Sequence, residues 1–259
     1  MRKLLFSVSV VSLLGISGLS IEAHAEENKH YESNSLVEFV PSMDPTDPVN
    51  PENPDPEKPV KPVDPTNPDG PNPGTNGPLS IDYASSLKFG RNRISNRDQV
   101  YFARTQSYHE DQFNTANFVQ VSDHRGTNSG WSLKVKQQKQ LTATSETLNN
   151  VLTGAQIRLA RPTVNSNALN VEKPEAMDEV VLIPGEESVL VTAKIGAGAG
   201  TWSTHWGEVM EMEEWDEYGE SQSINVTKDI QLSVPGATPK DAVTYQTSLV
   251  WMLTDVPEM

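Results

Sequence analysis

Runs of alternating apolar and polar residues recur from residue 79 to the end of the chain and predict β-strands. Alternation of this kind places every second side chain on one face, as in a strand with one buried face. Asn-Asn, Pro-Gly and glycine-rich turns separate several of the runs, and no long helical period is found. The clearest runs begin at Leu79, Trp131, Ala155, Val189, Ile230 and Tyr245. We therefore predict an all-β fold, with a single β-sandwich domain over residues 79–259.

Residues 1–25 have the pattern of an export signal. Arg2 and Lys3 precede an apolar stretch that starts at Leu4, and Ala23-His24-Ala25 provides small residues for cleavage. The apolar stretch is shorter than the ~20 residues that a membrane span needs. The prediction is a secreted protein with no membrane span after signal removal, beginning with a short polar tail at residues 26–40.

A proline-rich segment over residues 41–78 holds thirteen of the nineteen prolines. Many of them recur every third residue, as Pro45, Pro48 and Pro51 do, which favours a polyproline II helix. At about 3.1 Å per residue, the stretch from Pro45 to Pro71 would hold its ends roughly 80 Å apart. We predict a semi-rigid linker, or stalk; a ligand for proline-recognition modules is the alternative.

Composition removes several classes of function. The chain has no cysteine, which excludes disulfide frameworks, zinc fingers and thiol catalysis. Its formal net charge of −15 argues against nucleic-acid binding, which needs a basic surface. No metalloprotease or serine-hydrolase motif is found, and the glycines of residues 196–200 precede no helical pattern. We expect no enzyme and no cofactor; paired carboxylates within residues 208–220 are the remaining enzymatic alternative.

Two W-x-L tripeptides, at residues 131–133 and 251–253, stand in distinctive surroundings. Residues 118–133 read FVQVSDHRGTNSGWSL, and residues 245–257 read YQTSLVWMLTDVP. Between them lie GAGTW at residues 198–202 and LSVPG at residues 232–236. This ordered set, together with an export signal, resembles the WxL-domain surface proteins of low-GC Gram-positive bacteria over roughly residues 79–259.

The resemblance implies non-covalent attachment to the Gram-positive cell wall, with peptidoglycan as the expected ligand. It also implies partners among other WxL and WxL-interacting surface proteins. Trp131 and Leu133 match the first motif of the family, and Trp251 and Leu253 match the second. The alternative is an adhesin or interaction subunit that binds another surface protein or a host matrix protein, with purely structural W-x-L motifs.

The tryptophans allow two interpretations. An indole and a leucine on one strand face often belong to the core, whereas stacking on a sugar ring needs an exposed indole. Trp202, Trp206 and Trp215 lie in a segment that reads as a glycine-rich and then acidic loop, so we expect them to be more exposed than Trp131 and Trp251.

Seven acidic residues crowd between Gly207 and Gln222, in a segment that reads as a loop. One hypothesis is that they bind Ca²⁺ or strengthen adhesion in acid. Their spacing differs from an EF-hand, and a solvated loop is the simpler interpretation. The weak candidates for metal ligands are Glu211, Glu213, Glu214 and Asp216.

Overall fold

The computed structural model describes residues 29–109, 112–215 and 218–258. The predicted export signal and Asp216 lie outside these residues. The described residues contain fifteen strands and no helix, which confirms the all-β prediction. Accordingly, no helix in this part of the chain is long and apolar enough to cross a membrane. Of the described residues, 29–38 belong to one unit and those from Phe39 onward to another, which holds all the strands named below.

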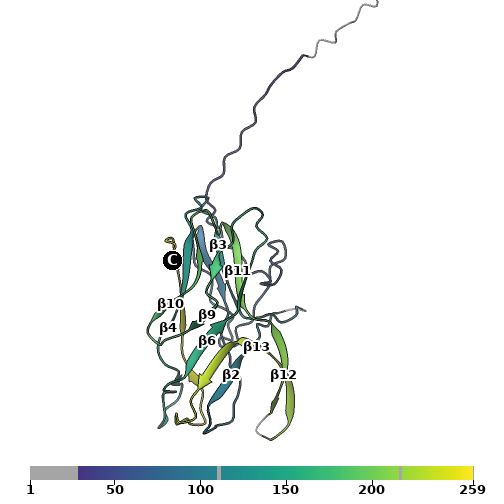
Figure 1. Cartoon of the computed structure of the whole chain (residues 1–259). Helices are drawn as coiled ribbons and strands as arrows, with labels where there is room; N and C mark the ends of the chain where they lie inside the picture. The colour runs from purple at the N-terminus through teal and green to yellow at the C-terminus, as the bar shows by residue number, and fades with distance from the viewer. Residues whose placement is uncertain (1–28, 110–111, 216–217, 259) are drawn as a thin grey trace, which may run out of the picture. The chain divides into compact units, whose positions relative to one another are not determined.

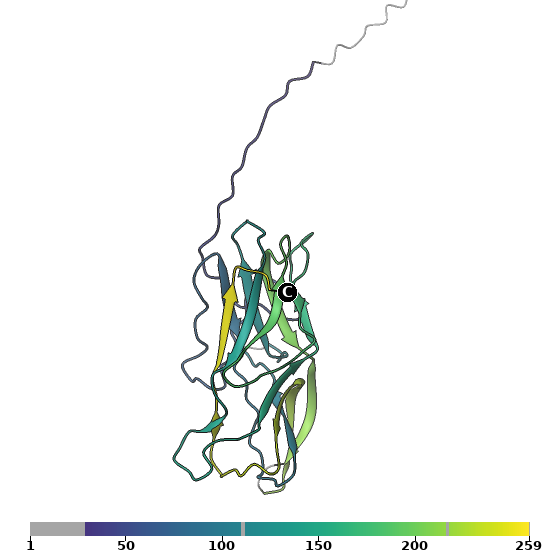
Figure 2. The same ribbon diagram turned by 60° about the vertical axis from the view of Figure 1, so that its left-hand side comes forward.

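The named strands pair in antiparallel fashion, and the larger sheets share one core (Figures 1 and 2). The strands are β1 (Leu79–Ala84), β2 (Gln99–Arg104), β3 (Phe118–Asp123), β4 (Trp131–Gln137), β5 (Thr142–Ala143), β6 (Gln156–Ala160), β7 (Pro162–Asn165), β8 (Glu175–Ala176), β9 (Glu179–Val181), β10 (Glu187–Ala193), β11 (Gly200–Trp206), β12 (Val209–Trp215), β13 (Ser221–Val234), β14 (Tyr245–Gln246) and β15 (Leu249–Thr254). Two four-stranded sheets have the orders β1-β3-β11-β7 and β15-β4-β10-β8. A third has the order β12-β13-β6-β9 with β2 also on β13, and β14 pairs with β5.

The two W-x-L tripeptides lie side by side in one sheet. β15 pairs with β4 so that Leu253 faces Leu133 directly and Trp251 faces Val135. Directly opposed residues of an antiparallel pair lie on the same face, so both tripeptides turn their Trp and Leu towards the core. The two motifs therefore join the beginning and the end of the domain into one packing unit.

The glycine-rich run at residues 196–200 packs closely against Trp131, the tryptophan of the first motif. Trp131 donates its indole N–H to the carbonyl of Gly198 at 3.0 Å. Gly198 has φ = 75°, and a Cβ there would lie 2.4 Å from the Cβ of Ala193 and 2.7 Å from the Trp131 indole nitrogen. Only glycine fits this turn. The glycine-rich run is a close-packed turn over an indole.

Residues 200–206 and 209–215 form strands where a loop was expected. Trp202 and Trp206 alternate with Thr201, Ser203 and His205 along β11, and the acidic segment forms β12, which pairs with β13 along its full length. The loop prediction is wrong for both segments. Alternation was present in β11, but the polar face formed by Thr201, Ser203 and His205, together with Thr204 between the two tryptophans, made the segment look like a loop.

The proline-rich segment also departs from the prediction. Residues 47–63, here called the strap, lie against the face of β3 that points away from the core. Gln120 accepts a hydrogen bond from the Val49 amide at 2.8 Å and donates to the Asp47 carbonyl at 3.0 Å. Val49 and Val60 are buried, the latter in a cluster with Tyr83 and Phe118. For these residues the prediction of a projecting stalk is wrong, and the folded unit begins before Leu79.

Asx turns are the physical reason. In the proline-rich segment an Asp or Asn repeatedly precedes a proline, and the amide of the residue after that proline donates to the Asp or Asn side chain. Such bonds link Glu52 to Asn50 at 2.9 Å and Thr66 to Asp64 at 2.7 Å. Each turn bends the chain where a polyproline II helix would continue straight. The segment can therefore follow the domain surface.

His205 offers a test of burial beneath the strap. It lies on the face of β11 that points away from the core, and burial lowers the pKa of its imidazole below the ordinary value of 6.5. The unfolded chain therefore binds more protons just below that value, so stability present at higher pH is lost as the pH falls below about 6.5. We expect the melting temperature to fall between pH 7.5 and 5.5, and to fall less in His205→Gln. Equal falls in the two proteins would contradict a buried, neutral His205; the carboxylates that titrate nearby are common to both.

Candidate functional site

Four of the six predicted wall-binding residues are core residues. Trp131 and Leu133 are each 1% exposed, and Trp202 and Trp206 are 5% and 4% exposed. The expected exposure of Trp202 and Trp206 is therefore wrong, and their indole faces are not available for stacking on sugar. The Trp202 indole N–H donates to the Ala199 carbonyl at 2.9 Å, so its polar group is already satisfied.

The second W-x-L motif lies nearer to the surface. Trp251 and Leu253 are half-buried, and Trp251 packs against Trp206 with ring centroids 6.2 Å apart. Because β15 is the edge strand of its sheet, one side of this motif borders an opening in the domain. Trp251 is one of the side chains that line that opening.

The acidic residues of β12 point in two directions. Successive side chains of a strand alternate, so Glu211 and Glu213 lie on one face and Glu214 lies on the other. Glu211 accepts a hydrogen bond from Ser223, and Glu214 forms an ion pair with Arg104 at 2.5 Å. Within the described residues, no group of three or more His, Asp or Glu side chains could hold a metal ion.

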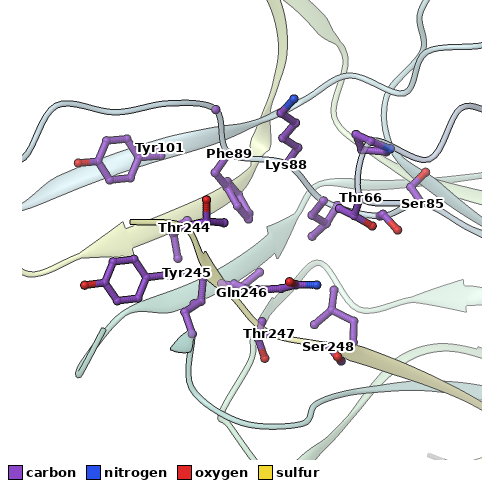
Figure 3. A pocket seen from close by; sticks show the side chains of 18 of the residues that line it. Thr66, Ser85, Lys88, Phe89, Tyr101, Thr244, Tyr245, Gln246, Thr247 and Ser248 are labelled. Carbon is purple, nitrogen blue, oxygen red and sulfur yellow. The ribbon is translucent and has the colours of Figure 1, made fainter. Parts of the chain in front are cut away.

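A cleft of about 1540 Å³ opens between the edges of the sheets and is the candidate functional site. One wall is β1 and the segment that follows it, residues 85–94; the other is residues 240–251, which include β14 and the start of β15. Figure 3 shows residues 244–248 crossing the cleft opposite Lys88 and Phe89, with the Phe89 ring directed towards them. The cleft is larger than the about 300–1,000 Å³ of a typical small-molecule site.

The floor of the cleft is apolar, and its mouth is aromatic and polar. Side chains of the core form the floor, among them Leu141, Leu152, Ile157, Leu232 and Val234. Trp215 and Tyr218, at the far end of the β12–β13 hairpin, stand at the mouth. Trp215 is 61% exposed, unlike the buried tryptophans of the core. It can therefore offer an indole face to a ligand.

A hydrogen-bond network fixes the wall formed by residues 240–246. The Tyr245 hydroxyl donates to the Asn149 carbonyl at 2.6 Å and accepts from the Asp241 amide at 2.9 Å. Hydrogen bonds from Thr147 and Asn149 lower the pKa of Asp241. On the other side of the cleft, partial burial raises the pKa of Tyr101. The hydrogen bonds of Tyr245 and Asp241 fix the position of the wall formed by residues 240–246.

Sequence reasoning missed this site because no motif marks it. Its residues come from segments far apart in the chain, including residues 64–67, 85–94 and 240–251. The available signals were weak: an exposed Trp215 within a predicted acidic loop, and a tyrosine, Tyr245, in a motif already assigned to the fold.

The comparisons with known proteins agree with the motif pattern. The WxL family, described as "WxL domain surface cell wall-binding", matches residues 26–257, which is nearly the whole chain. The match includes the strap as well as every strand. Comparisons with curated proteins and with solved structures gave no match. The chain therefore belongs to the WxL-domain family of secreted, cell-wall-binding surface proteins.

Proposed function

We propose that the chain attaches non-covalently to the cell wall by binding peptidoglycan in the cleft. The observation that carries the proposal is the cleft itself, with its apolar floor and with Trp215 exposed at its mouth. Peptidoglycan offers sugar rings with apolar faces and short peptides. An exposed indole suits the former, and a deep cleft between sheet edges suits the latter.

Burial of the motif tryptophans supports the choice of the cleft over the W-x-L tripeptides. Trp131 and Leu133 have no face open to a polymer, whereas Trp251 contributes to the cleft wall. The family motif then supports binding indirectly, by fixing β15 and hence one wall of the site. The proposal assigns the chain a binding role and no catalytic step.

A role as subunit of a surface assembly is the second part of the proposal. β12 is the edge strand of its sheet, and its outward side chains are largely exposed. An edge strand with open backbone groups is suited to pairing with an extended segment of another protein. This same feature favours the alternative function, in which the chain binds a surface or host protein instead of the wall.

Replacing Trp215 by alanine tests the proposal. Because the indole is exposed, its loss should change the free energy of unfolding by no more than about 0.5 kcal/mol. The melting temperature should therefore change little. We expect binding to weaken by up to about tenfold, since aromatic stacking contributes on the order of 0.5–1.5 kcal/mol. The measurement is co-sedimentation of the full chain with protein-stripped, teichoic-acid-free peptidoglycan.

Thr163→Ala is the matched control, because Thr163 is an exposed residue on β7 away from the cleft. It should bind like the wild type. Failure of the folded wild type to sediment would contradict peptidoglycan binding and favour the protein-interaction function. Wild-type binding by Trp215→Ala would contradict the role given to the mouth of the cleft.

A further inference from the structure

The cleft is bounded by extended backbone segments that have strand partners on one side. β1 and β15 are edge strands of their sheets, and β14 pairs with β5 alone among the strands of the described residues. All three contribute to the lining of the cleft. The outward backbone groups of Ile81 in β1 are already bonded to Thr75, so the main-chain donors and acceptors that the cleft presents come from the other edges.

The direction of these groups follows from the hydrogen bonds of residues 244–248. The carbonyls of Thr244 and Ser248 accept from the amides of Thr144 and Gln138, both at 2.9 Å. Backbone groups of an extended segment alternate in direction, so Tyr245 and Thr247 direct theirs to the opposite side. In residues 29–109, 112–215 and 218–258, the Thr247 amide has no hydrogen-bond partner among the backbone groups. Both residues line the cleft.

The facing wall is also paired on one side. The Ser85 amide donates to the Phe118 carbonyl at 2.9 Å, and the Lys88 carbonyl accepts from the Arg104 amide at 2.7 Å. These bonds tie residues 85–88 to β3 and β2. The segment runs opposite residues 244–248 (Figure 3). An extended chain entering the cleft would therefore lie between two backbones.

Residues 85–98 include the basic part of a cleft whose lining also includes the acids Asp64, Asp82, Glu214 and Asp241. Residues 85–98 carry four cations, Lys88, Arg91, Arg93 and Arg97, against the single acid Asp98, a local charge of +3. The chain as a whole has a net charge of −15. A ligand with free carboxylates is attracted to this segment more than to the remaining surface.

We propose that the cleft binds the peptide stem of peptidoglycan in an extended conformation, bonded to the backbone of Tyr245 and Thr247. The stem is a short peptide with small side chains and free carboxylates, which suits the paired edges, the apolar floor and the basic segment. The glycan then runs past Trp215 at the mouth. This inference rests on the proposed function and names the part of the polymer that enters the cleft.

Competition between the two parts of the polymer tests the inference. The full chain is sedimented with peptidoglycan in the presence of either a synthetic stem pentapeptide ending in D-alanyl-D-alanine or soluble, peptide-free glycan strands. We expect the pentapeptide to displace the chain and the glycan strands to be much weaker competitors. Displacement by the glycan strands alone would overturn the inference and leave the proposed function standing. If the folded wild-type chain does not bind peptidoglycan at all, both the inference and the proposed function are wrong.

Thr247→Pro and Thr247→Ala form a matched pair of variants. Both lose the hydrogen bond from the Thr247 hydroxyl to the Lys139 carbonyl, but only proline removes the backbone N–H. We expect Thr247→Pro to bind the pentapeptide about tenfold more weakly than Thr247→Ala, by the loss of one buried hydrogen bond. Melting curves of both variants show whether each is folded. If Thr247→Pro does not fold, the competition experiment still tests the inference, because it uses only the wild-type chain. Equal affinities of two folded variants would overturn the assigned backbone contact.

Discussion

Replacing Trp131 by alanine is expected to lower the free energy of unfolding by about 3–5 kcal/mol, the usual cost of removing a buried tryptophan. Trp131 is 1% exposed, packs in the common core and donates a hydrogen bond to Gly198. For a domain of this size the melting temperature should fall by roughly 10 °C or more, at about 2–4 °C per kcal/mol. Differential scanning calorimetry measures the effect.

Trp131→Phe separates packing from hydrogen bonding. It keeps an aromatic ring in the core but leaves the Gly198 carbonyl without its indole donor, so we expect a smaller loss of about 1–3 kcal/mol. At 10 °C, where Trp131→Ala remains folded, its binding to peptidoglycan should stay within about twofold of wild type, since the indole contacts no ligand. A folded Trp131→Ala that no longer binds would contradict the structural role of the first motif.

Removal of the strap is the second change with a large expected effect. A chain that begins at Asp64 lacks Val49 and Val60, and it exposes Gln120 and Phe118. Burial of the two valines alone contributes about 3–6 kcal/mol to the free energy of unfolding. Its loss corresponds to a fall in melting temperature of roughly 10–20 °C. The control is a chain that begins at Phe39 and retains the strap. Thermal melting of the two proteins, side by side, measures the difference.

If the strap were only a spacer that does not pack on the domain, its removal would have little effect on stability. The chain that begins at Asp64 would then melt within about 2 °C of the control, because no buried surface would be lost. Val49→Asp tests the same packing with a point substitution, since it places a carboxylate at a strap position that is buried against the domain. Full stability of that variant would also contradict the packing described above.

The fold was largely predictable because alternation is a local signal. The runs beginning at Trp131 and Ile230 became β4 and the end of β13, as expected. The predicted orientation of Tyr83 is wrong. The run from Leu79 predicted that it would share a face with Ile81, but the pairing of β1 with β3 shifts between these two residues. Tyr83 therefore packs with Phe118 in the outer cluster, while Ile81 stays in the core. A single β-bulge reverses the face, and alternation alone does not reveal it.

The candidate site was far less predictable. The tryptophans that stand out in the sequence are conspicuous because the core needs them: Trp131 and Trp202 close the glycine-rich turn with their indole N–H groups. The cleft depends on where sheet edges end and which segments meet there. That information is in the tertiary structure. A residue such as Thr247 carries no signal in the sequence, since its contribution is a backbone direction.

Hydrogen exchange of the full chain, with and without soluble peptidoglycan fragments, tests the central claim most directly. The claim is that the W-x-L motifs build the domain and that the cleft holds the wall polymer. We predict slower exchange in residues 85–94 and 240–251 on addition of the fragments, with β8 and β9 unchanged. Protection confined to segments outside the cleft, or no protection at saturating fragment concentration, would contradict the account.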